Sequence, residues 1–342
     1  MRALKAAILA TLFPVIVKAQ LNDSVRVYID SAINMMQRHS LYAEDLNWKV
    51  IRDSAHSMAA RANTYEEAAP ALQFAFNLLQ DKHGWLVLGG QSYVNPFMLR
   101  DNSRINEATL KKIKKPEVCS ERLNKQVAYL SIPSFGGQTT VSMNAFAQKL
   151  QDSLCKVILP ATKGLIVDLR LNGGGNMYPM IVGISNVLGN GKFIEFVNSR
   201  GEVDDSVEMK DFTLTLLDTM LIRLQKNCGR LDRLPVAVLI GPATGSSGEQ
   251  LAIILSTRKN TILIGEPTAG YVTANNGFLL PGRNHAIVMG QSYTRDKNGQ
   301  VYKANVAPAI VVAGGDNFEQ LNEDLKVKAA LRWLNQLFIK RG

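Results

Sequence analysis

The alternation of strand-like and helix-like segments constrains the fold of this chain most strongly. Between residues 127 and 264, short runs rich in β-branched residues alternate with longer amphipathic segments. Such alternation is typical of an α/β fold in which right-handed crossover helices join parallel strands. The predicted strands are residues 127–132, 165–169, 236–240 and 261–264, and the predicted helices are residues 144–158, 178–188 and 247–257.

The two flanks of this alternating part have other patterns. Residues 24–80 place apolar side chains three and four positions apart, which predicts helices, and residues 64–67 form a capping-box sequence. Residues 89–120 are irregular, charged and rich in turn-forming residues. Residues 285–295 are predicted as β-structure and residues 324–339 as a closing amphipathic helix. The predicted division is a helical N-terminal domain (20–82), a linker and cap region (83–125) and a core (126–342).

Residues 1–19 have the pattern of a secretory signal peptide. Arg2 and Lys5 precede an apolar run over residues 6–17, and a small residue, Ala19, closes the segment. This pattern predicts an exported protein, periplasmic or extracellular. No stable membrane span is expected after signal cleavage, because no later stretch approaches about 18 uninterrupted apolar residues.

Charge and cysteine content argue against several classes of partner. The formal net charge is +10, but the basic run 111–115 has no interleaved aromatic residues, so no nucleic-acid partner is predicted. The widely spaced Cys119, Cys155 and Cys228 indicate neither a disulfide scaffold nor a zinc site, and they allow one bridge and a spare thiol. No metal, cofactor or oligomeric state is predicted.

A strand, a turn and a helix carry the strongest candidate for chemistry. The strand at 236–240 leads through a Gly-Pro turn to Ser246 and Ser247, which open the next predicted helix. A serine at such a turn has its hydroxyl lifted clear of the sheet and facing the positive end of the helix dipole, as an acyl-transfer nucleophile requires. Because Ser246 and Glu249 also have capping-box spacing, a plain helix cap is the alternative.

Three consecutive glycines follow the predicted strand at 165–169. Gly173, Gly174 and Gly175 can expose successive backbone N–H groups, which suits an oxyanion or a phosphate. The phosphate alternative is weaker, because neither G-x-G-x-x-G nor a glycine-rich loop ending in Lys-Ser/Thr is present. A tight turn without a ligand is the structural alternative.

Three motifs, in one order, resemble those of the C-terminal processing (tail-specific) serine peptidases. Residues 167–175 resemble the L-D-L-R-x-N-x-G-G signature, residues 244–249 the nucleophile segment, and residues 264–270 the G-E-x-T-x-G segment. The resemblance runs from about residue 127 to the C-terminus. It implies a crotonase/ClpP-like α/β core with parallel strands and crossover helices, and a peptide or protein substrate. The stretch between residues 83 and 129 is too short for the PDZ domain that members often carry.

The resemblance also implies roles for the serines and glycines. Ser246 matches the nucleophile, with Ser247 as the fallback. The oxyanion donors would be the backbone N–H groups of Ser247 and of Gly173 or Gly174. Many members pair the serine with a lysine, but this chain has Tyr271 there, and a phenol with a pKa near 10 does not readily deprotonate serine.

A histidine takes the place of that lysine in the nisin-resistance-like and tricorn-core peptidases, which the chain resembles through its Asp81-Lys82-His83 segment. An imidazole is suited to remove the serine proton at neutral pH. Glu249 and Glu266 are candidates for orienting the imidazole, with capping or loop bracing as the alternative. The remaining histidines are expected at the surface (His39, His56) or in a structural position (His285).

These features together predict an exported serine endopeptidase that cleaves peptides or unstructured protein tails through a Ser246–His83 dyad and an acyl-enzyme. One alternative is a catalytically inactive, peptidase-like binding protein, which the Tyr271 substitution motivates. Another is an esterase using the same serine, because the two reactions differ only in the leaving group.

Overall fold

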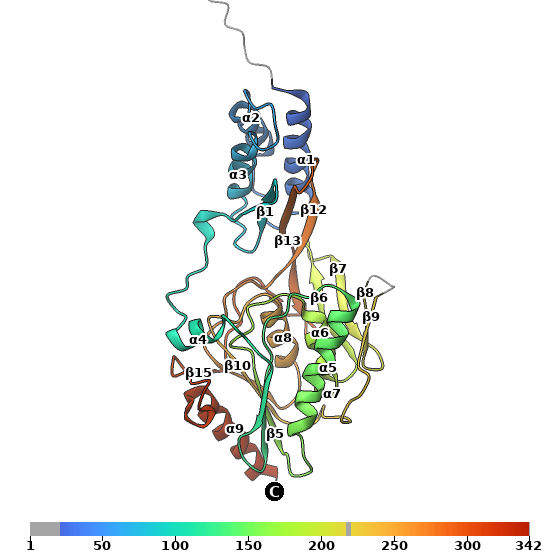
Figure 1. The fold of residues 1–342 in the computed structure, drawn as a ribbon, viewed down its shortest axis with the longest axis vertical. Coiled ribbons are helices and arrows are strands. Elements are labelled where there is room, and N and C mark those ends of the chain that lie inside the picture. Colours follow the sequence, from blue (N-terminus) through green and yellow to red (C-terminus); the bar gives the residue numbers. More distant parts are fainter. Residues whose placement is uncertain (1–20, 217–219, 342) are drawn as a thin grey trace, which may run out of the picture.

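A six-stranded sheet forms the centre of the computed structural model, which describes residues 21–216 and 220–341 (Figure 1). The predicted signal peptide lies outside the described residues. The strand order is β15-β11-β10-β5-β4-β3, with β3 antiparallel to β4 and the other pairs parallel. The strands are β3 (Cys119–Arg122), β4 (Val127–Ser131), β5 (Gly164–Asp168), β10 (Val236–Ile240), β11 (Thr261–Gly265) and β15 (Ile310–Val311).

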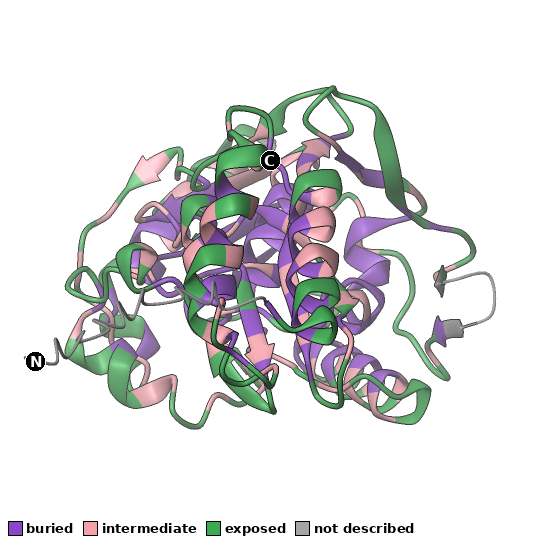
Figure 2. Ribbon diagram, turned by 90° about the horizontal axis from the view of Figure 1, so that it is seen from above, coloured by how far each residue is buried: buried purple, intermediate pink, exposed green. Residues whose placement is uncertain are grey.

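Helices cover both faces of this sheet, which explains why its central strands are continuous apolar runs. Val167 and Val238 pack beneath α5, α6 and α8, whereas their neighbours Ile166 and Leu239 pack against α9 on the other face. Figure 2 shows the buried residues gathered on the strands and on the helix sides that face them. The helices are α5 (Thr140–Val157), α6 (Met177–Gly183), α7 (Ser185–Leu188), α8 (Ser247–Ser256) and α9 (Leu325–Arg341).

A second, seven-stranded sheet is antiparallel, so the fold is mixed α/β rather than built on parallel strands alone. Its order is β2-β1-β13-β6-β7, and β12 and β14 also pair with β13. The strands are β1 (Trp85–Leu88), β2 (Gln91–Tyr93), β6 (Gly191–Val197), β7 (Val203–Met209), β12 (Thr273–Leu279), β13 (Ala286–Asp296) and β14 (Val301–Tyr302). A further hairpin pairs β8 (Thr213–Leu216) with β9 (Met220–Arg223).

Three helices at the N-terminal end pack on the far part of this second sheet. They are α1 (Asp23–His39), α2 (Trp48–Met58) and α3 (Ala69–Leu78), and their core includes Ile287 and Met289 of β13. Figure 1 shows β12 and β13 rising from the central body to these helices, with α9 at the opposite end. β13 therefore contributes to the core of the N-terminal helices. The domain boundaries at residues 82 and 125 stay a prediction.

The segment after β2 passes from the helical end to the six-stranded sheet (Figure 1). It contains the short helices η1 (Pro96–Met98) and α4 (Glu107–Lys112), so the basic run begins in the last turn of a helix. Farther along, η2 (Leu321–Glu323) precedes α9.

Cys155 and Cys228 form a disulfide, and Cys119 is exposed with a free thiol. In the described part of the chain, no helix has the length and apolar character needed to cross a membrane.

Candidate active site

Ser246 lies at the sharp turn between β10 and α8. Its φ of 50° and ψ of −117° fall in a region that is costly for a residue with a side chain. Two hydrogen bonds hold the turn: the Thr244 hydroxyl donates to the Leu169 carbonyl (2.9 Å), and the Gly245 N–H donates to the Asn172 carbonyl (2.9 Å). This local geometry presents the Ser246 side chain at the start of α8, as in other strand-to-helix nucleophile turns.

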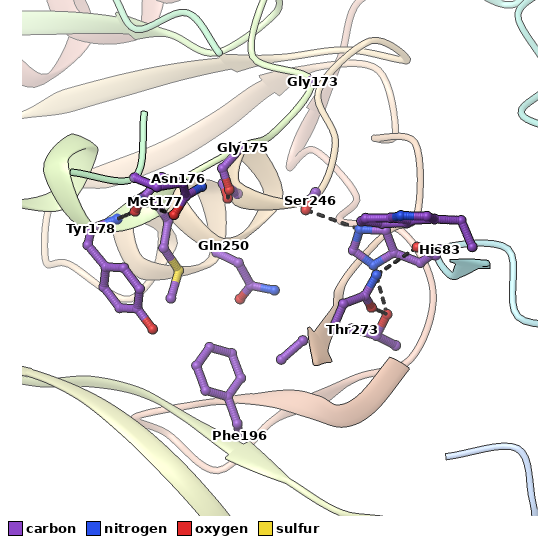
Figure 3. Close-up of a pocket in the computed structure, with 15 residues that line it drawn as sticks. His83, Gly173, Gly175, Asn176, Met177, Tyr178, Phe196, Ser246, Gln250 and Thr273 are labelled. Carbon is purple, nitrogen blue, oxygen red and sulfur yellow. Dashed lines mark hydrogen bonds between the residues drawn. The ribbon is translucent and has the colours of Figure 1, made fainter. Parts of the chain in front are cut away.

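His83 reaches Ser246 from the turn between α3 and β1. The Nε2 atom of His83 lies 3.1 Å from the Oγ atom of Ser246 (Figure 3). The buried carboxylate of Asp81 fixes this turn, because it accepts hydrogen bonds from the N–H groups of His83 (2.9 Å), Gly84 (3.1 Å) and Gly290 (2.7 Å). Asp81 therefore anchors the histidine turn to β13 and sets the direction of the imidazole.

Thr273, the first residue of β12, contacts the other nitrogen of the same ring. Its Oγ1 lies 2.9 Å from Nδ1 of His83 and donates to Oδ1 of Asn275 at 3.4 Å. The Asn275 amide in turn donates to the His83 carbonyl at 2.6 Å. These contacts form a closed set of hydrogen bonds among three residues, in which the Thr273 hydroxyl accepts from Nδ1–H of His83. A neutral imidazole protonated on Nδ1 fits this set and leaves the Nε2 lone pair facing the Ser246 hydroxyl. Thr273 carries no signal in the sequence, because 190 residues separate it from His83 and no local pattern joins the two.

Burial lowers the pKa of His83 to about 4, and the positive charge of Lys82 acts in the same direction, against the hydrogen bond with Thr273. The imidazole is therefore neutral at pH 7 and able to accept a proton. Among the described residues, no carboxylate lies within hydrogen-bond or ion-pair distance of the ring.

Glu249 and Glu266, the two predicted orienting carboxylates, bind elsewhere. Glu249 is fully buried and braces the loop after β11. It accepts hydrogen bonds from the N–H groups of Ser246 (2.9 Å), Gly270 (2.7 Å) and Tyr271 (2.7 Å) and from the Thr268 hydroxyl. Glu266 forms an ion pair with Lys326 at 3.0 Å. Neither carboxylate contacts the imidazole, and Thr273 occupies the position that an orienting carboxylate would take.

The glycine loop lies directly against Ser246. A Cβ at Gly174 would lie 2.8 Å from the Ser246 Cβ, and the φ of Gly174 is 121°, so a side chain here meets both a steric and a backbone penalty. The N–H of Gly173 donates to the Ser134 hydroxyl (2.8 Å), and the N–H of Gly174 donates to the Asn172 side chain (3.1 Å). Both predicted oxyanion donors of the loop are thus engaged by side chains.

Ser247 is the first residue of α8, and its side chain turns toward the same loop. Its hydroxyl donates to the Gly175 carbonyl at 2.6 Å. Of the two adjacent serines, Ser246 is therefore the one whose hydroxyl meets the imidazole of His83.

A cavity of about 550 Å³ opens beside Ser246 and His83. In Figure 3, Met177, Tyr178 and Phe196 lie across this space from the Ser246 and His83 pair. The lining includes no Asp, Glu, Lys or Arg side chain. Uncharged side chains of an extended peptide fit such a lining, because no fixed charge has to be desolvated there.

The other three histidines lie toward the helical end. His285 is buried and contacts the Tyr28 hydroxyl at 2.7 Å, as its predicted structural position implies. His39 stacks on Phe278, and Nε2 of His56 lies 3.0 Å from Asp30. His39 and His56 are half-buried rather than fully at the surface. Within residues 21–216 and 220–341, no group of three or more His, Cys, Asp or Glu side chains is arranged to hold a metal ion.

A serine hydroxyl at a strained turn, a neutral imidazole beside it and a glycine loop at a helix start define a serine-type hydrolase site. The sequence profile of peptidase family S41 matches residues 126–312, and the chain belongs to this family. It is a serine-type peptidase, and its substrates are peptides or proteins.

Known relatives agree with this assignment. The nisin-resistance protein of Lactococcus lactis subsp. lactis is 26% identical over 281 residues, which cover 82% of this chain and 80% of that protein. The solved structure of a lipoprotein from Streptococcus agalactiae has a TM-score of 0.67 at 22% identity, covering 96% of this chain and 99% of that chain. The photosystem II D1 C-terminal processing protease has a TM-score of 0.55 at 14% identity, covering 90% and 99%. The two structures show a shared fold.

Proposed function

We propose that this chain is an exported serine endopeptidase that cleaves peptides or unstructured protein tails through an acyl-enzyme on Ser246. The observation that carries the proposal is the 3.1 Å contact between the Ser246 hydroxyl and Nε2 of His83, with Nδ1 of the same ring held by Thr273. Together these contacts connect a nucleophile (Ser246) to a base (His83), and the base to a group that orients it (Thr273).

In the proposed reaction, Nε2 of His83 takes the proton of the Ser246 hydroxyl as Oγ bonds to the carbonyl carbon of the scissile peptide. The imidazolium then donates this proton to the leaving amine, whose bond to carbon breaks and leaves an ester on Ser246. A water molecule, deprotonated by the same imidazole, hydrolyses the ester and restores the serine hydroxyl.

The proposed oxyanion donors are the N–H of Ser247, at the start of α8, and an N–H of the glycine loop. Gly174 is close enough to Ser246 for this role, and its N–H is held by the Asn172 side chain. A carbonyl oxygen of the substrate would replace that side-chain acceptor. A preorganised donor of this kind contributes about 3 kcal/mol to stabilising the transition state.

The uncharged cavity favours apolar or neutral residues on one side of the scissile bond. We infer that the helical N-terminal part and the cap segment, residues 20–82 and 83–125, bound the peptide path on its other side. The six parallel and antiparallel strands with their flanking helices are consistent with a crotonase/ClpP-like core, which remains part of this proposal.

Export is supported by three features. Residues 1–19 have the signal-peptide pattern. The Cys155–Cys228 disulfide is suited to an oxidising compartment outside the cytosol. A protein of similar fold is described as a lipoprotein, and a relative as a nisin-resistance protein. We therefore place the mature chain in the cell envelope or outside the cell.

The test is to incubate a peptide library with the purified chain and with its Ser246→Ala variant, and to identify new termini by mass spectrometry. We expect termini that appear only with the wild type, next to apolar residues. Equal cleavage by both proteins would contradict the proposal. Peptide binding without turnover would favour the binding-protein alternative. If a parallel assay with ester substrates shows hydrolysis and the peptide library shows none, the esterase alternative is favoured.

A further inference from the structure

The disulfide between Cys155 and Cys228 joins a half-buried residue to an exposed one. Cys155 belongs to the last turn of α5 and is half-buried, whereas Cys228 lies in the segment between β9 and β10 and is exposed. Residues 225–230 are all exposed and contain no helix or strand. Cys228 is therefore the more accessible of the two cysteines to a molecule in solution.

Two amide side chains beneath the bridge donate hydrogen bonds to its sulfur atoms. Nε2 of Gln151, in α5, lies 3.0 Å from the Cys155 sulfur and 3.5 Å from the Cys228 sulfur. Nδ2 of Asn186, in α7, lies 3.4 Å from the Cys228 sulfur. Both amide side chains are buried. A hydrogen-bond donor at a sulfur atom favours its thiolate form, and a more stable thiolate is a better leaving group in thiol–disulfide exchange.

The carbonyl oxygens of the same two amides are buried without a partner. Oε1 of Gln151 and Oδ1 of Asn186 accept no hydrogen bond from any residue that the structure describes. A disulfide has no hydrogen to donate, whereas each thiol formed by its reduction has an S–H, which is a weak donor. A buried acceptor without a donor is costly, so reduction supplies at this place a donor that the oxidised form lacks. The amides therefore favour the reduced form more than an apolar lining would.

We propose that the Cys155–Cys228 disulfide is a thiol-exchange site, which a dithiol reduces reversibly in the folded protein. A thiolate of the dithiol attacks the Cys228 sulfur, the S–S bond breaks, and its electron pair leaves on the Cys155 sulfur beside the Gln151 amide. The second thiol of the dithiol then displaces Cys228 from the mixed disulfide. The chain gains two electrons and two protons, and the dithiol becomes a disulfide. This inference does not depend on the proposed peptidase reaction.

The segment around Cys228 is also held by contacts that do not involve sulfur. Oε1 of Gln148, in α5, accepts a hydrogen bond from the Gln225 N–H at 2.7 Å. On the other side of Cys228, the Leu231 N–H donates to the Asn186 carbonyl at 2.8 Å. These contacts fix the chain before and after the cysteine. The two thiols therefore stay near each other after reduction, and the bridge can form again.

The first experiment asks whether the folded chain undergoes exchange. The Cys119→Ser variant, which lacks the free thiol, is treated at pH 7 with several concentrations of dithiothreitol, with and without urea below the unfolding transition. Alkylation and mass spectrometry then count the reduced cysteines. We expect a rate that is proportional to the dithiothreitol concentration and that urea changes by less than about twofold. A rate that levels off with dithiothreitol and rises steeply with urea would mean that reduction requires global unfolding, and would overturn the proposal.

Trapping identifies the sulfur that is attacked. The same variant is treated with reduced glutathione, a monothiol, and the exchange is quenched with iodoacetamide. Peptide mapping then locates the mixed disulfide and the alkylated, released thiol. We expect glutathione on Cys228 and the alkyl group on Cys155, because the exposed sulfur is attacked and the other one leaves. Glutathione mainly on Cys155 would overturn the proposed direction of attack.

Matched variants in α5 test the role of Gln151. Gln151→Met keeps an unbranched side chain of similar size but has no donor, so reduction by dithiothreitol should be about tenfold slower. The equilibrium with a glutathione redox buffer should shift about tenfold toward the disulfide, which corresponds to about 30 mV. Gln148→Met is the control, because it loosens the segment without contacting sulfur, and it should not slow reduction.

Two results would overturn the role of Gln151: an unchanged rate in Gln151→Met, or equal slowing in the two variants. The melting temperature of each oxidised variant shows whether its fold is retained. The dithiothreitol and glutathione experiments need neither substitution in α5, so they test the exchange site even if Gln151→Met does not fold.

Discussion

The Nδ1 atom of His83 and the hydroxyl of Thr273 lie 2.9 Å apart, so a neutral group orients the imidazole that faces Ser246. A carboxylate in this position stabilises the imidazolium by its charge, as in the Ser-His-Asp triad. A hydroxyl fixes the tautomer without that charge. Together with burial, this leaves a base that stays neutral over a wide pH range and gains little stabilisation when it is protonated.

The pH dependence of peptide hydrolysis follows from this arrangement. His83 must be neutral to accept the Ser246 proton, and its pKa is lowered to about 4 by burial. As pH rises, kcat/KM should therefore increase through about pH 4 and be level near neutrality. An acid limb near the ordinary histidine value of about 6.5 would contradict the buried, uncharged environment.

A carboxylate introduced at residue 273, which contacts Nδ1 of His83, should move the acid limb of the pH profile of kcat/KM. In Thr273→Asp, a negative charge beside Nδ1 favours the imidazolium, so the pKa of His83 and the acid limb should rise by about one to three units. The comparison is the kcat/KM profile of the wild type and the variant across the same pH range. An unmoved limb would mean that residue 273 does not act on the base.

Removing the Thr273 hydroxyl should slow catalysis without unfolding the chain. Thr273→Val keeps the side-chain shape but leaves Nδ1–H without its partner, and the loss of one buried hydrogen bond corresponds to a fall in kcat of about tenfold to a hundredfold. Thr273→Ser retains the hydroxyl and should stay within a fewfold of the wild type. Equal kcat for the valine and serine variants, with unchanged melting temperatures, would show that the contact has no catalytic role.

The buried ion cluster around Arg170 should be more sensitive to the loss of one partner than an exposed ion pair. Arg170 is buried and lies 2.6 Å from each of Asp168, Asp316 and Asp324. Arg170→Ala leaves Asp168 and Asp324 without a cationic partner, whereas Asp316 keeps its ion pair with Lys326 (2.8 Å). The variant should lower the free energy of unfolding in urea by about 3–5 kcal/mol. The matched control is Arg200→Ala, which breaks the exposed pair with Glu202 and should cost at most about 1 kcal/mol. Equal losses would contradict the importance of burial.

The disulfide should stabilise the core. Cys155 and Cys228 are 73 residues apart in sequence and join the last turn of α5 to the segment before β10. A cross-link of this kind contributes about 2–4 kcal/mol. The double variant Cys155→Ser/Cys228→Ser should unfold at a lower urea concentration, whereas Cys119→Ser should not, because that thiol is free and exposed. No difference between the two variants would contradict a formed bridge.

The parallel strands could be predicted from the sequence because they are buried on both faces and their apolar runs are short and well bounded. β10 has the predicted bounds, and β5 differs by one residue at each end. α5 begins four residues before its predicted start, because Thr139 caps it by accepting a hydrogen bond from the Ser142 N–H. Of the antiparallel sheet, the predicted β-structure at residues 285–295 corresponds to β13. β7 carries no comparable signal, because it exposes most of its residues and has no clear apolar alternation.

The site was predictable only where a motif marks its residues. Ser246 and the glycine loop lie in local patterns, and His83 follows from a D-x-H segment 163 residues away. Thr273 and Asn275 carry no such mark, because their contacts with His83 arise only when β12 pairs with β13 beside the histidine turn. For Glu249 the sequence allows either an orienting role or a capping and loop-bracing role. Its hydrogen bonds with the Gly270 and Tyr271 N–H groups match loop bracing, and they form only in the folded loop.

The central claim is that His83 activates Ser246, and covalent labelling tests it most directly. The purified chain is treated with a fluorophosphonate at pH 7, and the adduct is located by peptide mapping in the wild type, Ser246→Ala, Ser247→Ala and His83→Ala. The account predicts one adduct, on Ser246, which is absent in Ser246→Ala, present in Ser247→Ala and formed at least about a hundredfold more slowly in His83→Ala. An adduct on another residue, or equally fast labelling of Ser246 without His83, would contradict it.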